Sequence, residues 1–191
     1  SRATHLQSRI GGLDGRALRK GDVLNLGMRV GASAPSAGRT CPLESRPNYR
    51  ACPTLRVISG PHADRFHREA LDALTSGAYQ LTLQSDRMGY RLDGPALNLL
   101  DDGHQISEAT PLGSIQIPPN RQPILLMVDR QPTGGYPMPA IMMVADLPLA
   151  AQLLPGDRLT FAWIDRQEAV RFLQAQHQAL DEALPAVLPS P

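Results

Sequence analysis

Three polar, glycine-containing segments carry the side chains best suited to bind an anion or a carbonyl group. They are Ser85–Arg91, Ser107–Pro119 and Asp129–Pro137, and each adjoins a run with β-strand periodicity. In the first segment, Gly89 permits a turn that aims Arg87 and Arg91 at a common point, beside Tyr90. Guanidinium groups held in this way suit a carboxylate or a phosphate and predict an anionic substrate. The other interpretation is an exposed hairpin in which Asp86 pairs with an arginine.

The glycine pair of the third segment predicts an oxyanion site. Gly134-Gly135 lets consecutive backbone N–H groups approach a ligand closely. Four neighbouring side chains supply further donors, namely Arg130, Gln131, Thr133 and Tyr136. A Gly-Gly pair is also an ordinary turn, and the pattern alone leaves both interpretations open. If the segment forms an oxyanion site, Arg130 and Gln131 are candidate catalytic residues. The candidate substrate-binding residues come from the first and third segments and are Asp86, Arg87, Tyr90, Arg91, Thr133, Gly134, Gly135 and Tyr136.

The second segment contributes a candidate base and a candidate amide-binding side chain. Glu108 and Gln116 lie at the two ends of a loop that enters a strand. Glu108 is suited to act as a general base, and Gln116 to recognise an amide substrate. Glu108 is equally suited to cap a turn or pair with an arginine.

The histidines do not form a recognisable catalytic or metal-binding pattern. They are His5, His62, His67, His104 and His177, and their spacing matches no metal site. A serine hydrolase elbow, G-x-S-x-G, is absent from the sequence. We therefore interpret the histidines as surface or core residues and predict no metal.

Composition excludes several partners and chemistries. The 191 residues carry 19 basic and 18 acidic side chains, which gives no field to attract nucleic acid or an anionic membrane. Lys20 is the only lysine, and it lies in neither a phosphate-binding loop nor a biotin-acceptor context. Any biotin must come from another chain. Cys41 and Cys52 are interpreted as unpaired thiols of a cytoplasmic protein.

Periodicity predicts a β-rich fold. Short strands are expected at Asp22–Leu26, Leu55–Ile58, Tyr79–Leu83, Tyr90–Leu92, Ser114–Ile117, Ile124–Val128, Ile141–Val144 and Arg158–Trp163. A helix is expected over Phe66–Thr75, a second one capped by Asp146, and an amphipathic helix after Asp165 that Pro185 ends. A weak internal echo relates Leu18–Leu24 to Leu153–Leu159, each a tight turn before a strand.

Several motifs, in order, resemble one family. They are Gly11–Leu18, Ser85–Pro95, Ser107-Glu108, Gly113–Pro119, Asp129–Gln131 with Thr133–Pro137, Ala145–Pro148 and Pro155–Asp157. The sequence is similar to the KipA family, also named allophanate hydrolase subunit 2, the C-type subunit of bacterial 5-oxoprolinase, and the carboxyltransferase A/B domain of urea carboxylase. The resemblance covers about residues 1 to 165.

The resemblance implies cyclophilin-like β-barrels. Residues 1–30 would be the end of a first barrel whose N-terminal portion has no counterpart here, and 31–54 a linker. Residues 55–165 would form the second barrel, and 166–191 an amphipathic helix and tail. The implied function is that of a subunit in ATP-dependent opening of a lactam, 5-oxoproline, to glutamate. The implied partners are a KipI-like, B-type subunit and an A-type subunit. The implied cofactor is ATP, bound together with these partner subunits.

Two other functions remain open at this point. Urea-carboxylase relatives move a carboxyl group from carboxybiotin to urea, and KipA-like proteins bind a KipI-type inhibitor of a sensor kinase without catalysis. The sequence also departs from the family pattern. Pro132 and Met138 replace a threonine and a lysine, and Ala109 replaces a glycine after Glu108. These departures predict an altered substrate choice or lost activity.

Overall fold

The structure is a computed structural model that describes residues 4–6, 8–25, 43 and 46–183. The chain divides into two compact units, Ser1–Arg39 and Thr40–Pro191. Most of the linker predicted over residues 31–54 lies outside the described residues, as does Cys41. Cys52 is an exposed free thiol. Within the described ranges, no helix is both long and apolar enough to cross a membrane.

The described part of the first unit consists of turns and one isolated bridge between His5 and Ile10. The strand predicted at Asp22–Leu26 does not form over residues 22–25, and Leu26 lies outside the described residues. The Asp22 carboxylate instead holds a turn, because it accepts two hydrogen bonds of 2.8 Å from the Arg16 guanidinium. Large apolar side chains in the described part of this unit are exposed, namely Leu6, Ile10, Leu18, Val23 and Leu24.

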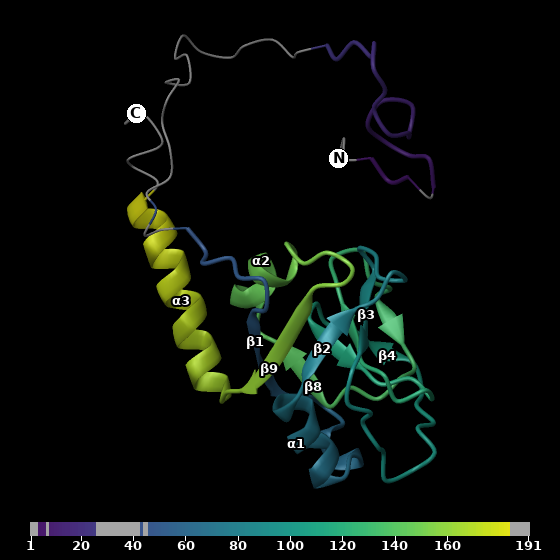
Figure 1. Ribbon diagram of the computed structural model, residues 1–191, viewed down its shortest axis with the longest axis vertical. Coiled ribbons are helices and arrows are strands. Elements are labelled where there is room, and N and C mark those ends of the chain that lie inside the picture. Colours follow the sequence, from purple (N-terminus) through teal and green to yellow (C-terminus); the bar gives the residue numbers. More distant parts are fainter. Residues whose placement is uncertain (1–3, 7, 26–42, 44–45, 184–191) are drawn as a thin grey trace. The chain divides into compact units, whose positions relative to one another are not determined.

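Seven described strands of the second unit close into a barrel (Figure 1). They are β1 (Thr54–Ser59), β2 (Ala78–Leu81), β3 (Gly89–Asp93), β5 (Ser114–Gln116), β6 (Ile124–Leu126), β8 (Ala140–Met142) and β9 (Arg158–Trp163). Their order around the barrel is β1-β8-β5-β6-β3-β2-β9. Neighbours are antiparallel except β1 and β9, whose parallel pairing closes the barrel. The mainly β barrel predicted from the sequence is confirmed.

Alternation of side chains builds the barrel core. In β1 the buried residues are Leu55 and Val57, and in β9 they are Leu159 and Phe161, with Leu55 opposite Phe161. The ring of Phe161 lies 5.6 Å from that of Tyr79 on β2, which anchors one end of the core. The other inward-facing residues are mostly Leu, Ile and Met from the remaining strands. Each strand predicted within residues 55–163 corresponds to an observed barrel strand, although several bounds differ.

Four predicted strands end earlier than expected. Those predicted to end at Leu83 and Ile117 end at Leu81 and Gln116. In the other two, a turn or a short helix takes over the backbone. The strand predicted at Ile124–Val128 ends at Leu126, because the chain turns at residues 128–129, where the Arg130 N–H binds the Met127 carbonyl at 3.2 Å. The strand predicted at Ile141–Val144 ends at Met142, because Val144 begins a short 3-10 helix, η3 (Val144–Asp146).

Helices cover the outside of the barrel. They are η2 (Ala63–Arg65), α1 (Arg68–Ser76), η3, α2 (Leu147–Ala150) and α3 (Arg166–Ala183). The helix predicted from Phe66 begins two residues later, because Phe66 is extended and forms a bridge with Leu99. The predicted cap of α2 is also wrong. The fully buried Asp146 carboxylate makes no capping bond, and instead accepts hydrogen bonds from the N–H and guanidinium of Arg56.

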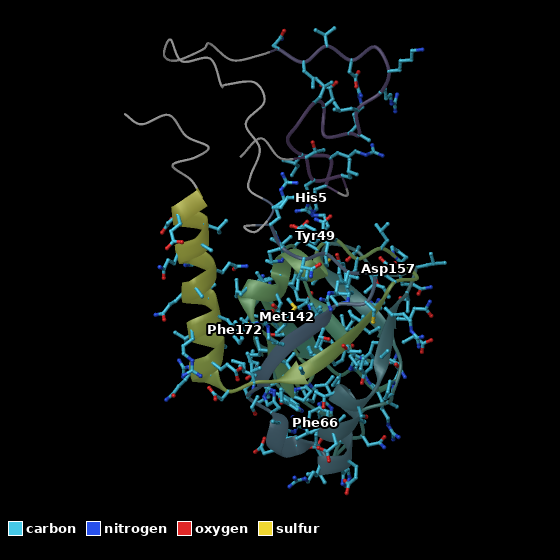
Figure 2. The ribbon with its side chains drawn as sticks, turned by 60° about the vertical axis from the view of Figure 1, so that its left-hand side comes forward. His5, Tyr49, Phe66, Met142, Asp157 and Phe172 are labelled. Carbon is cyan, nitrogen blue, oxygen red and sulfur yellow. The ribbon has the colours of Figure 1, made fainter. Side chains whose placement is uncertain are left out.

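The predicted C-terminal helix is confirmed as α3, although Leu184 and Pro185 lie outside the described residues. Figure 2 shows Phe172 on the side of α3 that faces the barrel. Its ring lies 4.0 Å from the Arg56 guanidinium carbon, a cation–π contact. Gln176 donates to the Ala145 carbonyl at 3.1 Å. The helix is thus fixed to the same Arg56 that pairs with Asp146.

Candidate functional site

A two-stranded ribbon brings the second and third polar segments together. Strand β4 (Glu108–Ala109) pairs antiparallel with β7 (Thr133–Gly134), so that Glu108 lies opposite Gly134. This pairing lies outside the barrel strands, and the sequence pattern did not predict either short strand. The candidate base and the candidate glycine nest therefore belong to one small structure, which we call the β4–β7 ribbon.

The ribbon covers Gln116. Since Ile115 on β5 points into the barrel core, Gln116 points outward, yet it is only 1% exposed. A Cβ atom at residue 134 would lie 2.5 Å from the Gln116 Nε2 atom and 3.1 Å from Cγ2 of Thr110. The glycine therefore allows the ribbon to approach the amide closely. We call Glu108, Thr110, Gln116 and Gly134 the Gln116 cluster.

The Gln116 amide nitrogen has unused donors. Among the described residues, the buried Nε2 atom has no hydrogen-bond partner. A buried N–H group without an acceptor costs about 1–3 kcal/mol, so such groups are seldom left unused. Donors held in a dry place suit a carbonyl oxygen, and more so an oxygen that becomes negative during a reaction. Gln116 has the properties expected of an amide-binding or oxyanion-binding group.

Arg130 and Gln131 hold the end of the ribbon through hydrogen bonds with Thr110. The Arg130 Nε donates to the Thr110 carbonyl at 2.7 Å, and the Thr110 hydroxyl donates to the Gln131 carbonyl. The Thr110 N–H also binds the Pro132 carbonyl at 3.0 Å. These bonds join the segment after β4 to the segment before β7. Arg130 is thus close to the Gln116 cluster, although part of its guanidinium is used to hold the backbone.

Arg87 and Arg91, predicted to aim at a common point, have different surroundings in the structure. The Arg87 guanidinium forms a 2.8 Å bond to Asp129, and its side chain is 77% exposed. Arg91 lines a separate hollow of about 200 Å³ with Asn120 and Gln122. Arg87 lies in the turn before β3, whereas Arg91 lies within β3.

Asp86 and Tyr90, which flank Arg87 and Arg91 in the first segment, make contacts that hold the fold. The Asp86 carboxylate accepts the N–H groups of Met88 and Gly89 at 2.8 and 3.2 Å, which holds the turn before β3. Tyr90 packs against the barrel core, and this burial raises its pKa. The backbone N–H of Asp129 binds the Arg87 carbonyl at 2.9 Å, so this turn lies against the start of the third segment.

A histidine that the sequence pattern did not single out contacts the ribbon. His62 Nε2 lies 3.0 Å from Oε1 of Glu108, and its Nδ1 accepts the Met138 N–H at 3.1 Å. His62 follows β1, far from Glu108 along the sequence, so only the closed barrel reveals the pair. Met138 itself is fully buried. A lysine at that position would bury its ammonium group, which fits the methionine found here.

A second missed residue, Arg65, organises the loop before the ribbon. Its guanidinium binds both oxygens of Asp101 at 2.7 and 2.8 Å and also contacts Gln105. The hydrogen bond from Arg65 lowers the pKa of Asp101. A Cβ atom at Gly135 would lie 3.3 Å from the Gln105 carbonyl and 3.5 Å from the Ser107 hydroxyl. The loop thus packs directly against the glycine pair, whereas the neighbouring Tyr136 side chain is partly exposed.

Comparison with known proteins places this arrangement in a family. Residues 1–163 match the family described as the carboxyltransferase domain, subdomain A and B. The chain belongs to this family. Helix α3 begins beyond the matched residues.

Relatives of this carboxyltransferase domain carry two names. The chain is 36% identical over 180 residues to the C subunit of the 5-oxoprolinase of Escherichia coli, covering 94% of this chain and 56% of the relative. It is 28% identical over 200 residues to the urea amidolyase of Lachancea kluyveri, covering 95% of this chain and 11% of that protein. The chain therefore spans about half the length of the bacterial relative.

A solved structure supports the carboxyltransferase-domain fold. The crystal structure of the K. lactis urea amidolyase aligns with a TM-score of 0.83 at 24% identity, and covers 100% of this chain and 13% of that one. At this identity the likeness concerns the fold alone.

Proposed function

We propose that this chain forms part of a subunit of a 5-oxoprolinase-type enzyme, which opens the lactam ring of 5-oxoproline to give glutamate. The names of the bacterial relatives support this reaction. The single structural observation that carries it is the buried Gln116 Nε2, whose donors have no partner among the described residues. A lactam carbonyl is the kind of acceptor that these donors require.

The Gln116 cluster supplies two of the functions that lactam opening requires. Water adds to the carbonyl carbon, the C–N bond breaks, and the products are a carboxylate and an amine. Negative charge develops on the carbonyl oxygen during the addition, where the Gln116 N–H groups stabilise it. Glu108, on the ribbon strand opposite Gly134, takes a proton from the attacking water. The released nitrogen later receives that proton.

We assign the requirement for ATP to the assembled enzyme, in which this protein works with a KipI-like, B-type subunit and an A-type subunit. A lactam is a poor electrophile, and ATP hydrolysis by the assembled enzyme would drive its opening. In the described part of this chain, the guanidinium of Arg130 holds the Thr110 carbonyl next to the ribbon, and that of Arg87 is bound to Asp129. No phosphate-binding step is therefore assigned to this chain's residues.

A second candidate reaction is carboxyl transfer from a biotin carried by another chain. The family description and the urea amidolyase relatives favour it. Urea is also a planar amide, so the Gln116 donors would bind its carbonyl oxygen in the same way. The two reactions differ in what they consume, which makes them separable.

One assay distinguishes the reactions. The full-length protein, combined with its A-type and B-type partners, is given 5-oxoproline with and without ATP, and separately urea with a carboxybiotinylated carrier protein. We expect glutamate release that depends on ATP and on every subunit. Carboxylated urea without glutamate would establish the second reaction instead. Tight binding of the KipI-like partner without either product would indicate a regulator and refute both reactions.

A further inference from the structure

His62 is held in one orientation by the backbone next to the ribbon. The His62 N–H donates to the Met138 carbonyl at 3.2 Å, and the Met138 N–H donates back to the ring nitrogen Nδ1 at 3.1 Å. The preceding residues are also tied to this segment, since the Gly60 N–H binds the Pro139 carbonyl at 2.8 Å. Backbone bonds at both ends of the residue leave the ring little freedom to turn.

This arrangement fixes the tautomer of the neutral ring. A ring nitrogen that accepts an N–H group carries no proton itself, so the proton of neutral His62 lies on Nε2. Nε2 faces Oε1 of Glu108 at 3.0 Å. A protonated nitrogen therefore lies next to the carboxylate whether the imidazole is neutral or charged.

The contact is close but not yet a well-aligned hydrogen bond. Oε1 of Glu108 is buried, and no described residue contacts it with hydrogen-bonding geometry. The His62 side chain is 12% exposed, whereas that of Glu108 is 38% exposed, so one end of the carboxyl group is accessible. A small rotation of Glu108 aligns the pair, as catalytic hydrogen bonds often align when substrate binds.

We propose that His62 is a positioning residue that forms a dyad with Glu108. This inference rests on the proposed lactam opening. His62 holds Oε1 through Nε2, which leaves the other carboxylate oxygen to face the attacking water. The water O–H bond breaks, its proton passes to Glu108, and its oxygen bonds to the carbonyl carbon. The C–N bond then breaks as the nitrogen takes up the proton, and His62 keeps its own proton throughout.

Three variants of the full-length protein, assembled with its partner subunits, test the dyad in the glutamate-release assay. His62→Leu removes the donor, and we expect kcat to fall about 100-fold with little change in KM, because the base is misplaced but substrate contacts remain. His62→Gln restores an N–H donor near the Nε2 position and should recover most of kcat. His67→Gln, on an exposed histidine at the start of α1, should behave as wild type.

A spectroscopic measurement tests the dyad without any reaction. In the ¹⁵N spectrum of the full-length protein, His62 should show a protonated Nε2 and an unprotonated Nδ1, and Glu108→Gln should shift the Nε2 signal. A protonated Nδ1, or a Nε2 signal that ignores Glu108→Gln, would refute the dyad. So would full kcat in His62→Leu.

The two proposals fail in different ways. If the wild-type assembly opens no lactam, the proposed function is wrong, and the ¹⁵N signals alone decide the dyad. If the wild type is active and His62→Leu retains its kcat, the function stands and the dyad is wrong. A merely structural role for His62 predicts that His62→Gln and His62→Leu lose stability equally without a selective loss of kcat.

Discussion

Gly134 and Gln116 fit together so closely that a single added carbon would force them apart. A Cβ atom at residue 134 would lie 2.5 Å from Nε2 of Gln116. The flexible end of the glutamine can move, so Gly134→Ala should change stability little but displace the amide donors. We expect glutamate release to fall about 100-fold, the usual cost of losing one oxyanion donor.

Two comparisons make the Gly134→Ala result decisive. Combined with Gln116→Ala, it should cost no more activity than Gln116→Ala alone, because both changes remove the same donor. Gly94→Ala provides the contrast in stability, since its Cβ would lie 2.6 Å from the buried Tyr79 ring, which cannot yield. Denaturant unfolding should show a large loss in the free energy of unfolding for Gly94→Ala but not for Gly134→Ala. If the activity losses of Gly134→Ala and Gln116→Ala add in the double variant, Gly134→Ala does not act by displacing the Gln116 amide.

The buried Asp146 should be the most important charge for the stability of the barrel. It accepts bonds from the Arg56 N–H and guanidinium, and Arg56 also lies over Phe172 of α3. Asp146→Ala leaves these donors without an acceptor. Because the Arg56 side chain is 28% exposed, we expect a loss of about 3 kcal/mol in the free energy of unfolding, at the low end for a buried pair.

Urea denaturation of the full-length protein measures this loss. Arg68→Ala is the matched control, because its 4.0 Å pair with Asp72 on α1 is largely exposed, 90% and 70% for the two side chains, and should contribute nothing measurable. Equal effects of the two substitutions would show that burial does not set the strength of the Asp146 pair.

The loop before the ribbon should lose its order in acid. The Arg65 hydrogen bond lowers the pKa of Asp101, and the Gly103 N–H adds to this effect. A carboxyl group with a lowered pKa stabilises the fold above its unfolded-state value of about 3.9, and this contribution disappears as pH falls through the lowered folded-state value. We therefore expect the bond between Arg65 and Asp101 to persist at pH 4 and to break below it.

Titration of the Asp101 carboxyl carbon by NMR checks this expectation. Arg65→Gln should raise the midpoint toward the ordinary aspartate value, while Arg68→Gln should leave it unchanged. An identical midpoint in wild type and Arg65→Gln would mean that Arg65 does not hold the loop.

Sequence periodicity identified the barrel strands because the alternation of apolar and other residues within a strand can be read from neighbouring positions. The strand Arg158–Trp163 was predicted with its observed bounds, since the large apolar Leu159 and Phe161 alternate with polar or small residues. Local patterns failed where a distant partner decides the structure. Asp146 resembles a helix cap, but Arg56, 90 residues away, takes its carboxylate. Phe66 has helical spacing, but its bridge to Leu99 keeps it extended.

The candidate site could be predicted only in part from the sequence, because its residues are brought together by partners that lie far apart along the chain. Glu108, Gln116 and Gly134 were selected by residue type, and the ribbon brings them together. Their grouping depends on two strands of two residues each, too short to leave a periodic signal. His62 carried no motif at all, because its relation to Glu108 arises from the backbone bonds to Met138.

The most direct test of the account is Gln116→Met, which keeps the size of the side chain but removes its donors. Since those donors are buried and unpaired among the described residues, the substitution should leave the free energy of unfolding unchanged or raise it by about 1 kcal/mol. It should lower kcat/KM for glutamate release at least about 100-fold. Gln80→Met, at an exposed glutamine bound to Gly156, should leave kcat/KM unchanged. A Gln116→Met protein that is less stable and fully active would contradict the account, because Gln116 would then support the fold and not the substrate.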